Sequence, residues 1–152
     1  MAESKYEKYL VRKAARPREF FHEEKTGGET NPPMVFLNGE DPIQGTNQFI
    51  EAGWIWGPRR ADRPHAHNFD EIFLWIGTDL DDPDYLGGEI EFTLGEGEEA
   101  EKLTINSTSC LYVPKGLVHQ PTIYKRVDKP FLVVTMGVNS GKWVRSKIIK
   151  DG

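Results

Sequence analysis

The sequence predicts an all-β fold, in which antiparallel sheets close into a barrel or pack as a sandwich. Two observations predict it. Turn-forming pairs such as Gly27-Gly28 and Asp41-Pro42 break the chain too often for helices. Between the breaks lie nine short runs rich in β-branched and aromatic residues, which is the composition of strands. Many short strands in one small chain favour a barrel or a sandwich, since these arrangements enclose a core.

The first element along the chain is expected to be a helix. Tyr6, Tyr9 and Lys13 recur at spacings of three and four, which permits a short amphipathic helix within residues 4–15. Pro17 would end that helix, because proline lacks the N–H that a continuing helix uses.

The remaining elements are expected to be strands of one domain. A chain of 152 residues suffices for one core but is short for two. We therefore treat residues 1–30 as an N-terminal extension and residues 31–152 as a single β-barrel domain. Its strands are expected at residues 34–38, 47–56, 70–77, 88–95, 101–106, 109–114, 119–127, 130–138 and 141–149.

Composition narrows the class of protein. The formal net charge of −5 and the pI near 5.4 argue against a nucleic-acid or anionic-membrane surface, which would need clustered Lys and Arg. No apolar run approaches the ~20 residues of a membrane helix, and we expect no secretory segment. Cys110 is the only cysteine, so no intramolecular disulfide can form. We therefore expect a cytoplasmic protein whose partner is a small molecule.

Histidines gather where the sequence enters a buried strand. His65 and His67 are two residues apart, so both side chains point to one face of an extended strand, and Glu71 can reach that face. His119 begins another expected strand; alone, it would most simply be a core or surface residue. Together, three imidazoles and a carboxylate in an apolar barrel would cost a few kcal/mol for each unsatisfied group, roughly. A divalent metal ion removes that cost, so we predict a metal site.

The predicted ligands indicate which metals fit. Imidazoles suit Zn, Cu, Fe and Ni, and one carboxylate extends the set to Mn; we expect one Fe(II), Mn, Zn or Ni ion per chain. Four protein ligands leave octahedral positions open, which is typical of catalytic sites. Three neutral histidines, Glu71 and a divalent ion carry a net charge near +1, which favours a carboxylate, enolate or hydroxy-keto substrate.

The stretches "HAHNFDE" and "PKGLVH" resemble the two conserved motifs of the cupin superfamily of small β-barrels. In that family the first motif contains His-x-His followed by Glu, and the second contains Pro-x-Gly-x-x-His. The resemblance therefore assigns the metal ligands to His65, His67, Glu71 and His119, and it implies an antiparallel jelly-roll barrel. It also implies a homodimer, with the segment "PPMVFLN" as a candidate for the shared edge.

The resemblance leaves the reaction open, since cupins include dioxygenases, decarboxylases, lyases, isomerases, cyclases and proteins without catalysis. By family analogy we expect a non-haem dioxygenase acting on a small oxygen-rich substrate. One alternative is a non-oxidative enzyme, namely a decarboxylase, lyase, isomerase or cyclase; the other is a protein that binds a small ligand without turnover. A general base beside the metal would favour an enzyme, and a purely apolar cavity would favour the binding protein.

Aromatic residues are expected around the site. Alternation from Glu71 predicts that Phe73 and Trp75 face the cavity. Trp54 and Trp56 share one face of the preceding strand, so they belong either to the core or to the wall of a substrate pocket.

Three polar residues complete the candidates for the site. Among the arginines near the turn into the site, Arg63 is our candidate for anchoring a substrate carboxylate; the alternative is a solvated side chain. Tyr112 and Gln120 flank the second motif. With Glu71 they are candidates for a catalytic acid, base or hydrogen-bond donor, unless they only satisfy backbone groups.

Overall fold

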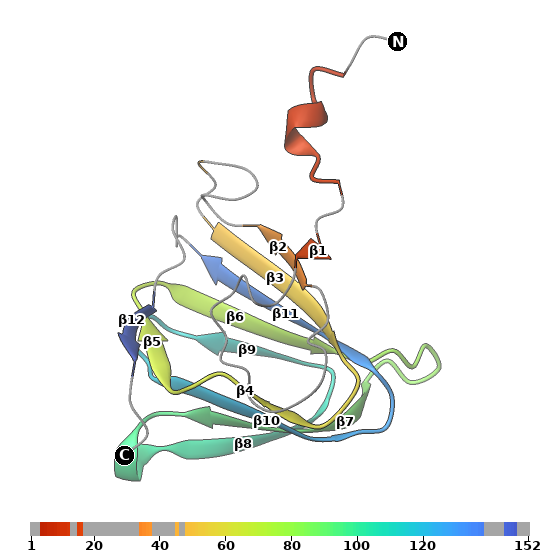
Figure 1. Cartoon of the computed structure of the whole chain (residues 1–152). Coiled ribbons are helices and arrows are strands. Elements are labelled where there is room, and N and C mark those ends of the chain that lie inside the picture. The colour runs from red at the N-terminus through yellow and green to blue at the C-terminus, as the bar shows by residue number, and fades with distance from the viewer. Residues whose placement is uncertain are drawn as a thin grey trace.

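The computed structural model describes residues 4–12, 15–16, 34–37, 45, 48–138 and 145–148, and it confirms the all-β prediction. Two antiparallel sheets face each other as a jelly-roll sandwich (Figure 1). The first sheet contains, in spatial order, β1 (Ala15–Arg16), β2 (Met34–Leu37), β3 (Gln48–Ile55), β11 (Phe131–Val138), β6 (Asp70–Ile76) and β9 (Ser109–Val113).

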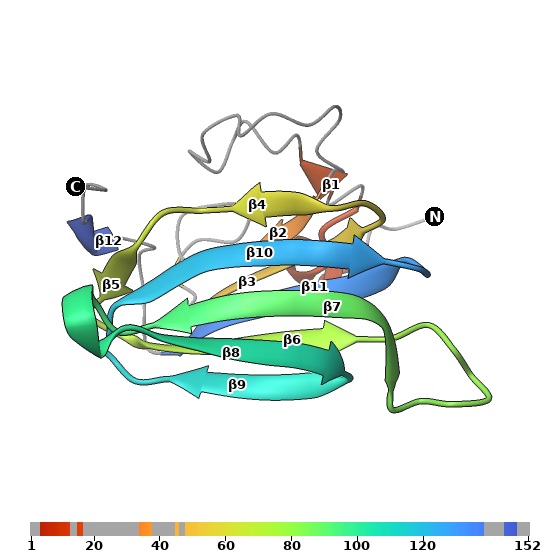
Figure 2. The same cartoon turned by 90° about the horizontal axis from the view of Figure 1, so that it is seen from below.

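The second sheet carries most of the site. Figure 2 shows β4, β10, β7 and β8 side by side. Its strands are β12 (Arg145–Ile148), β5 (His65–His67), β10 (His119–Val127), β7 (Tyr85–Leu94) and β8 (Glu101–Ser107), and β4 (Arg59–Ala61) pairs with β10. β4 was not predicted, because it is only three residues long, whereas β5 is the extended segment expected at His65 and His67; Pro64 lies between the two.

The predicted N-terminal helix is reduced to a single 3-10 turn, Glu7–Tyr9. Tyr6 and Tyr9 are 62% and 64% exposed, so the expected apolar stripe is not buried against the described strands. Short helices depend on such packing for stability, which explains the difference. Lys13 lies outside the described residues. Across the described part of the chain, no helix has the length and hydropathy needed to cross a bilayer.

The segment that we predicted as a dimer edge contains β2, which follows β1 in the order of the first sheet. β2, the described part of the "PPMVFLN" segment, pairs with β1 on one side and with β3 on the other. At Val35, β2 therefore lies between two strands of the same chain, and the dimer edge stays a prediction. β1 itself lies inside the stretch that we predicted to be an extension, residues 1–30.

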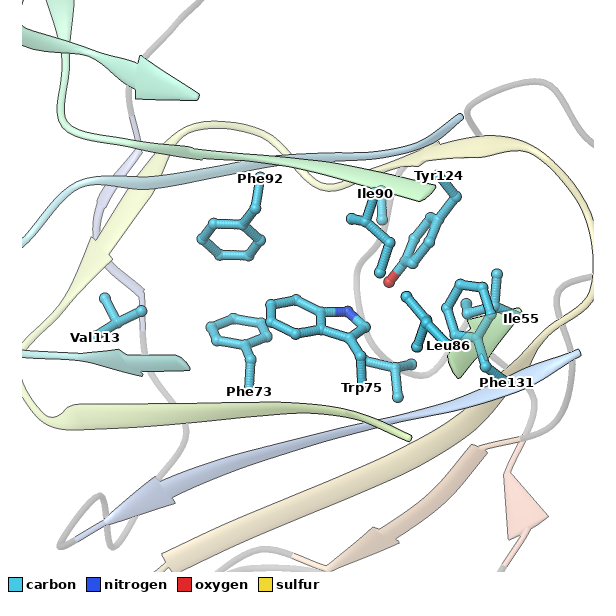
Figure 3. Packing of buried hydrophobic residues seen from close by; sticks show 11 residues of the cluster. Ile55, Phe73, Trp75, Leu86, Ile90, Phe92, Val113, Tyr124 and Phe131 are labelled. Carbon is cyan, nitrogen blue, oxygen red and sulfur yellow. The ribbon is translucent and has the colours of Figure 1, made fainter. Parts of the chain in front are cut away.

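The core fills the space between the two sheets (Figure 3). Phe73 and Trp75 point inward from β6, as alternation predicted, and both are at most 5% exposed. Trp75 meets Phe92 of β7 edge to face, with ring centroids 5.5 Å apart. Because the next inward position along β6 is Glu71, the strand that anchors the core also aims a carboxylate at one end of it.

Candidate metal centre

Three strands bring the four predicted ligands together inside the sandwich. β5 supplies His65 and His67, β6 supplies Glu71, and β10 supplies His119, which pairs directly opposite His65 in the ladder. All four side chains are buried, with exposed fractions between 1% and 4%. The ligands therefore come from both sheets, and folding assembles them.

The donor atoms of these side chains converge. Nε2 of His65 lies 3.1 Å from Nε2 of His67. Oε2 of Glu71 lies 2.8 Å from Nε2 of His119 and 3.5 Å from Nε2 of His67. One ligand atom from each of the three histidines can be chosen so that all lie within 4.8 Å of one another. Such a cluster has the dimensions of a site for a single ion.

Hydrogen bonds on the far side of two rings fix which nitrogen faces the cluster. Nδ1 of His65 donates to the carbonyl oxygen of Arg63 at 2.6 Å, and Nδ1 of His119 donates to that of Leu117 at 3.0 Å. A carbonyl oxygen only accepts, so a neutral ring with this bond carries its proton on Nδ1. Nε2 of His65 and of His119 then present lone pairs to the cluster.

The pair formed by Glu71 and His119 tests whether a metal ion fits. Oε2 of Glu71 and Nε2 of His119 are 2.8 Å apart, yet neither atom makes a hydrogen bond. With a neutral His119 both atoms are acceptors, because the bond to Leu117 holds the ring proton on Nδ1, and burying two facing acceptors without a donor is unfavourable. A divalent cation bound by both atoms would remove this cost, so the residues fit a metal site.

A layer of further contacts holds the ligands in place. Phe69 stacks on His67, with centroids 4.5 Å apart and planes 14° from parallel, and Phe49 meets Phe69 at 5.6 Å. The backbone N–H of Gly116 in the second motif donates to the carbonyl oxygen of His67 at 2.8 Å. This bond ties the two motifs together. Such supporting contacts orient metal ligands.

A cavity of about 50 Å³ opens beside the cluster. Three of the predicted substrate and catalytic residues line it, namely Glu71, Phe73 and Gln120. Gln120 is buried, and its Oε1 accepts a hydrogen bond from the hydroxyl of Thr122 at 2.6 Å. The lining is mixed rather than apolar, and it consists of Glu51, Arg59, Ala61, Asp62, His65, His67, Glu71, Phe73, Gln120, Thr122, Tyr124, Val133 and Thr135.

Several predicted residues lie away from this cavity. Trp54 and Trp56 are 47% and 50% exposed, because the buried side chains of β3 lie on its opposite face. They are therefore neither core nor pocket wall. Trp75 is buried behind Phe73, with centroids 5.7 Å apart, and does not line the cavity. Arg63 is exposed and contributes its backbone carbonyl, not its side chain, to the site.

Tyr112 is also outside the cavity, at 56% exposed. Its hydroxyl bonds to the carboxylate of Asp70, and this bond raises the pKa of Tyr112. The backbone N–H of Lys115, together with Tyr112, lowers the pKa of Asp70. Tyr112 therefore serves the turn that carries the second motif and has no position from which to reach a substrate.

Eight lining residues were not among the predicted site residues, and four of them bear on the chemistry of the cavity, namely Glu51, Arg59, Asp62 and Tyr124. Glu51 lies on the inward face of β3 with Phe49 and Ile55. A charged residue on a buried strand face is the sequence signal that could have identified Glu51 as a site residue. The guanidinium of Arg59 lies 5.4 Å from the centroid of the Tyr124 ring.

Asp62 sits beside the first histidine. Its Oδ1 lies 3.8 Å from Nδ1 of His65 and accepts a hydrogen bond from the N–H of Arg63 at 2.8 Å. Asp62 also has φ of 58°, an uncommon backbone angle for a residue other than glycine. The chain thus turns sharply between β4 and β5 and returns to the cluster.

Comparison with known proteins supports the fold. No family model and no curated protein matches the sequence. Among solved structures, oxalate oxidase in complex with the substrate analogue glycolate matches with a TM-score of 0.52 and 14% identity, over 78% of this chain and 57% of that one. Oxalate decarboxylase of Bacillus subtilis, in a study of its Mn(II) centres, matches with a TM-score of 0.54 and 12% identity, over 80% of this chain and 29% of that one.

Both neighbours are cupins, so the cupin resemblance of the two sequence motifs is confirmed at the level of the fold. The present chain spans about half of the oxalate oxidase chain and under a third of the oxalate decarboxylase chain. Figure 1 shows the two sheets of this fold, with β5 and β12 at one end of the sandwich.

Proposed function

Because the chain has the cupin fold and gathers four buried donor atoms, we propose that it is a metal-dependent enzyme acting on a small oxygen-rich compound. His65, His67, Glu71 and His119 would hold one divalent ion, Fe(II), Mn, Zn or Ni. When bound, such an ion supplies Lewis-acid stabilisation of negative charge on substrate oxygens. The observation that carries the proposal is the contact between two buried acceptors, Oε2 of Glu71 and Nε2 of His119.

The size of the cavity limits the substrate. A cavity needs a volume of ~10–15 Å³ to hold one water molecule. A cavity of about 50 Å³ therefore admits a ligand of only a few non-hydrogen atoms. Small hydroxy, oxo and dicarboxylic acids are in this range, and the two structural neighbours are named for oxalate.

The charges of the lining favour a carboxylate substrate bound in one orientation. Glu51, Asp62 and Glu71 contribute three formal negative charges and Arg59 one positive charge, so a divalent ion would bring the lining to neutrality. Arg59 is then the side chain able to hold a substrate carboxylate through paired N–H donors. We therefore propose Arg59, which lines the cavity, as the anchor in place of Arg63.

The polar lining favours an enzyme over a binding protein. Glu51 and Asp62 are carboxylates beside the ligand cluster, and either can accept a proton from a substrate hydroxyl or carboxyl group. Gln120 offers an amide N–H₂ to a substrate oxygen while its Oε1 is held by Thr122. A cavity for a passive apolar ligand would not need these groups.

For the reaction we propose a non-haem dioxygenase first, on the analogy with the cupin family. Non-oxidative decarboxylation is the second candidate, and the structural likeness to oxalate decarboxylase favours it. Both reactions use the same small carboxylate and the same ligands. The chain is proposed to work on a small molecule in the cytoplasm, without a nucleic-acid or membrane partner.

The test combines metal analysis with a reaction screen. Protein purified without added metal should contain close to one divalent ion per chain, and His67→Ala and Glu71→Ala should lose most of it. O₂ consumption and CO₂ release are then measured over oxalate, glycolate and related acids. Lys102→Ala, an exposed position on β8, is the control that keeps both metal and activity. Equal metal content in all four proteins would refute the assignment, and tight substrate binding without either gas change would favour the binding protein.

A further inference from the structure

β10 contains a bulge at the point where it leaves the ligand cluster. Between His119 and Thr122 its pairing with β7 shifts register. Over this interval β10 advances by three residues, whereas the partners in β7, Leu94 and Phe92, are two residues apart. One residue of β10 is therefore extra, which defines a β-bulge. Because a bulge redirects the side chains around it, it determines which residues after His119 face the interior.

The bulge brings Gln120 into the interior beside His119. Successive side chains of a regular strand point to opposite faces, so Gln120 would otherwise point away from the core. Instead both residues are buried, and alternation resumes at Pro121, with Thr122 and Tyr124 buried between partly exposed neighbours. Figure 3 shows the ring of Tyr124 between the two sheets. The bulge thus adds one polar side chain, that of Gln120, to the wall of the cavity.

The backbone of Gln120 adopts a conformation that residues with a side chain disfavour. Its φ of 76° lies in the left-handed region, which glycine adopts readily and glutamine rarely. Such conformations reduce stability, and they cluster at active sites and ligand-binding sites. Glycine would meet this backbone angle at lower cost, so the presence of glutamine points to a role for its side chain.

A buried hydroxyl group fixes the amide of Gln120. Oγ1 of Thr122 donates a hydrogen bond to Oε1 of Gln120 at 2.6 Å, and the two residues are 2% and 7% exposed. Thr122 lines the same cavity. Because Oε1 is engaged as an acceptor, the amide presents its N–H₂ donors to whatever fills the cavity. This part of the wall is therefore a hydrogen-bond donor.

We propose that Thr122 is a positioning residue that holds Gln120 as a hydrogen-bond donor to the substrate. The inference rests on the proposed function, and it specifies the ligand further. Besides any oxygen that reaches the histidine cluster, the substrate carries an acceptor, such as a carboxylate or keto oxygen, at the Gln120 wall. An ammonium group in this place would meet only donors and is selected against. Gln120 contacts the substrate, and Thr122 acts only through Gln120.

Oxalate binding to the Zn(II)-loaded full chain, measured by isothermal titration calorimetry, tests the role of Thr122. Thr122→Val keeps nearly the same shape and removes the donor. Its Kd for oxalate should rise about tenfold, because an amide that is free to turn loses a hydrogen bond to a charged group. Thr122→Ser restores the hydroxyl and should restore most of the affinity. Thr104→Val, at an exposed position of β8, is the matched control and should bind as the wild type does. The Kd for Zn(II) should be equal in all four proteins.

A second pair of variants distinguishes a role in binding from a structural role of Gln120. Gln120→Gly and Gln120→Ala both remove the amide, so each should weaken oxalate binding about tenfold or more. Glycine relieves the left-handed strain and alanine keeps it, so Gln120→Gly should melt about 2–4 °C above Gln120→Ala. At a regular strand position the order is reversed, since glycine destabilises strands. The melting temperatures are measured without metal and do not depend on the proposed function.

Several results would overturn the inference. An oxalate Kd that is unchanged in Thr122→Val would mean that the hydroxyl does not act on the ligand. A loss that Thr122→Ser does not restore would mean that the effect is one of packing. Gln120→Gly melting below Gln120→Ala would contradict a conformation kept for the side chain. If Thr122→Val does not fold, unchanged oxalate binding by Gln120→Ala overturns the inference instead.

Failure of the inference and failure of the proposed function give different results. A Zn(II)-loaded wild type that binds neither oxalate nor glycolate would overturn the inference and leave the metal site intact. A wild type that takes up no Zn(II) would refute the proposed function. In that case the melting order of the two Gln120 variants alone decides whether the bulge is kept for the glutamine side chain.

Discussion

Replacing Glu71 by Gln should change the stability of this protein in opposite directions with and without metal. When His119 is neutral and carries its proton on Nδ1, Oε2 of Glu71 and Nε2 of His119 are two acceptors 2.8 Å apart, and neither makes a hydrogen bond. The amide N–H₂ of a glutamine in this place can donate to Nε2 of His119. Glu71→Gln thus converts an unfavourable buried contact into a hydrogen bond, and it removes a buried charge.

The size of the effect follows from burial. Glu71 is 4% exposed, so its unsatisfied oxygen should cost ~1–3 kcal/mol of stability. For a chain of this length 1 kcal/mol shifts Tm by about 2–4 °C. The metal-free variant should therefore melt ~2–12 °C above the metal-free wild type. Metal at 100 times its Kd adds ~2.7 kcal/mol to the wild type, and much less to a variant that lacks the carboxylate ligand.

The assay is differential scanning calorimetry of both proteins after chelation and after addition of Zn(II) or Mn(II). We expect the order of Tm values to reverse between the two conditions. Glu91→Gln is the control, because Glu91 is on the outward side of β7 with two lysine partners and should show no such reversal. A metal-free Glu71→Gln variant that melts below the wild type would refute the description of the cluster as facing acceptors.

Three further predictions concern other parts of the molecule. Gly137→Ala should lower Tm, since the added Cβ would lie 2.3 Å from Cε1 of Phe49, and overpacking of this kind costs ~1–3 kcal/mol; an unchanged melting curve would contradict the packing around the site. Arg59→Ala should raise KM for a carboxylate substrate more than ~10-fold without loss of metal, as measured by steady-state kinetics and elemental analysis, and an unchanged KM would exclude Arg59 as the anchor. Hydrogen bonds from Lys125 and Lys102 hold the pKa of Glu91 below its ordinary value of 4.5. The contribution of Glu91 to the free energy of unfolding is therefore present at neutral pH and is lost as the pH falls below 4.5. Glu91→Gln should flatten the dependence of stability on pH in this acidic range.

The ligands could be predicted from the sequence because their signal is local. His65 and His67 share a strand face by alternation, and the spacing to Glu71 and the turn before His119 match known motifs. Alternation also gave the inward direction of Phe73 correctly. These inferences need only the knowledge that the segments are extended, which the composition supplies.

The rest of the pocket depends on contacts that are distant in sequence. Ile50, Ala52 and Trp54 make one face of β3 fully apolar, whereas the other face carries Glu51 beside Ile55, so alternation alone favours burial of Trp54. The structure instead buries Ile55. Arg59 reaches the cavity because β4 pairs with β10, placing Arg59 opposite Tyr124. Nothing in the sequence from Arg59 to Arg63 indicates this pairing, so the sequence alone does not identify Arg59 as the candidate anchor for a substrate carboxylate.

The central claim is that four side chains bind one ion, and anomalous diffraction tests it most directly. Crystals of the full chain grown with Zn(II) are measured on both sides of the zinc absorption edge. The account predicts one strong peak per chain within about 2.0–2.2 Å of the side-chain atoms of His65, His67, Glu71 and His119. A peak at other residues, or none at this cluster under saturating metal, would contradict it.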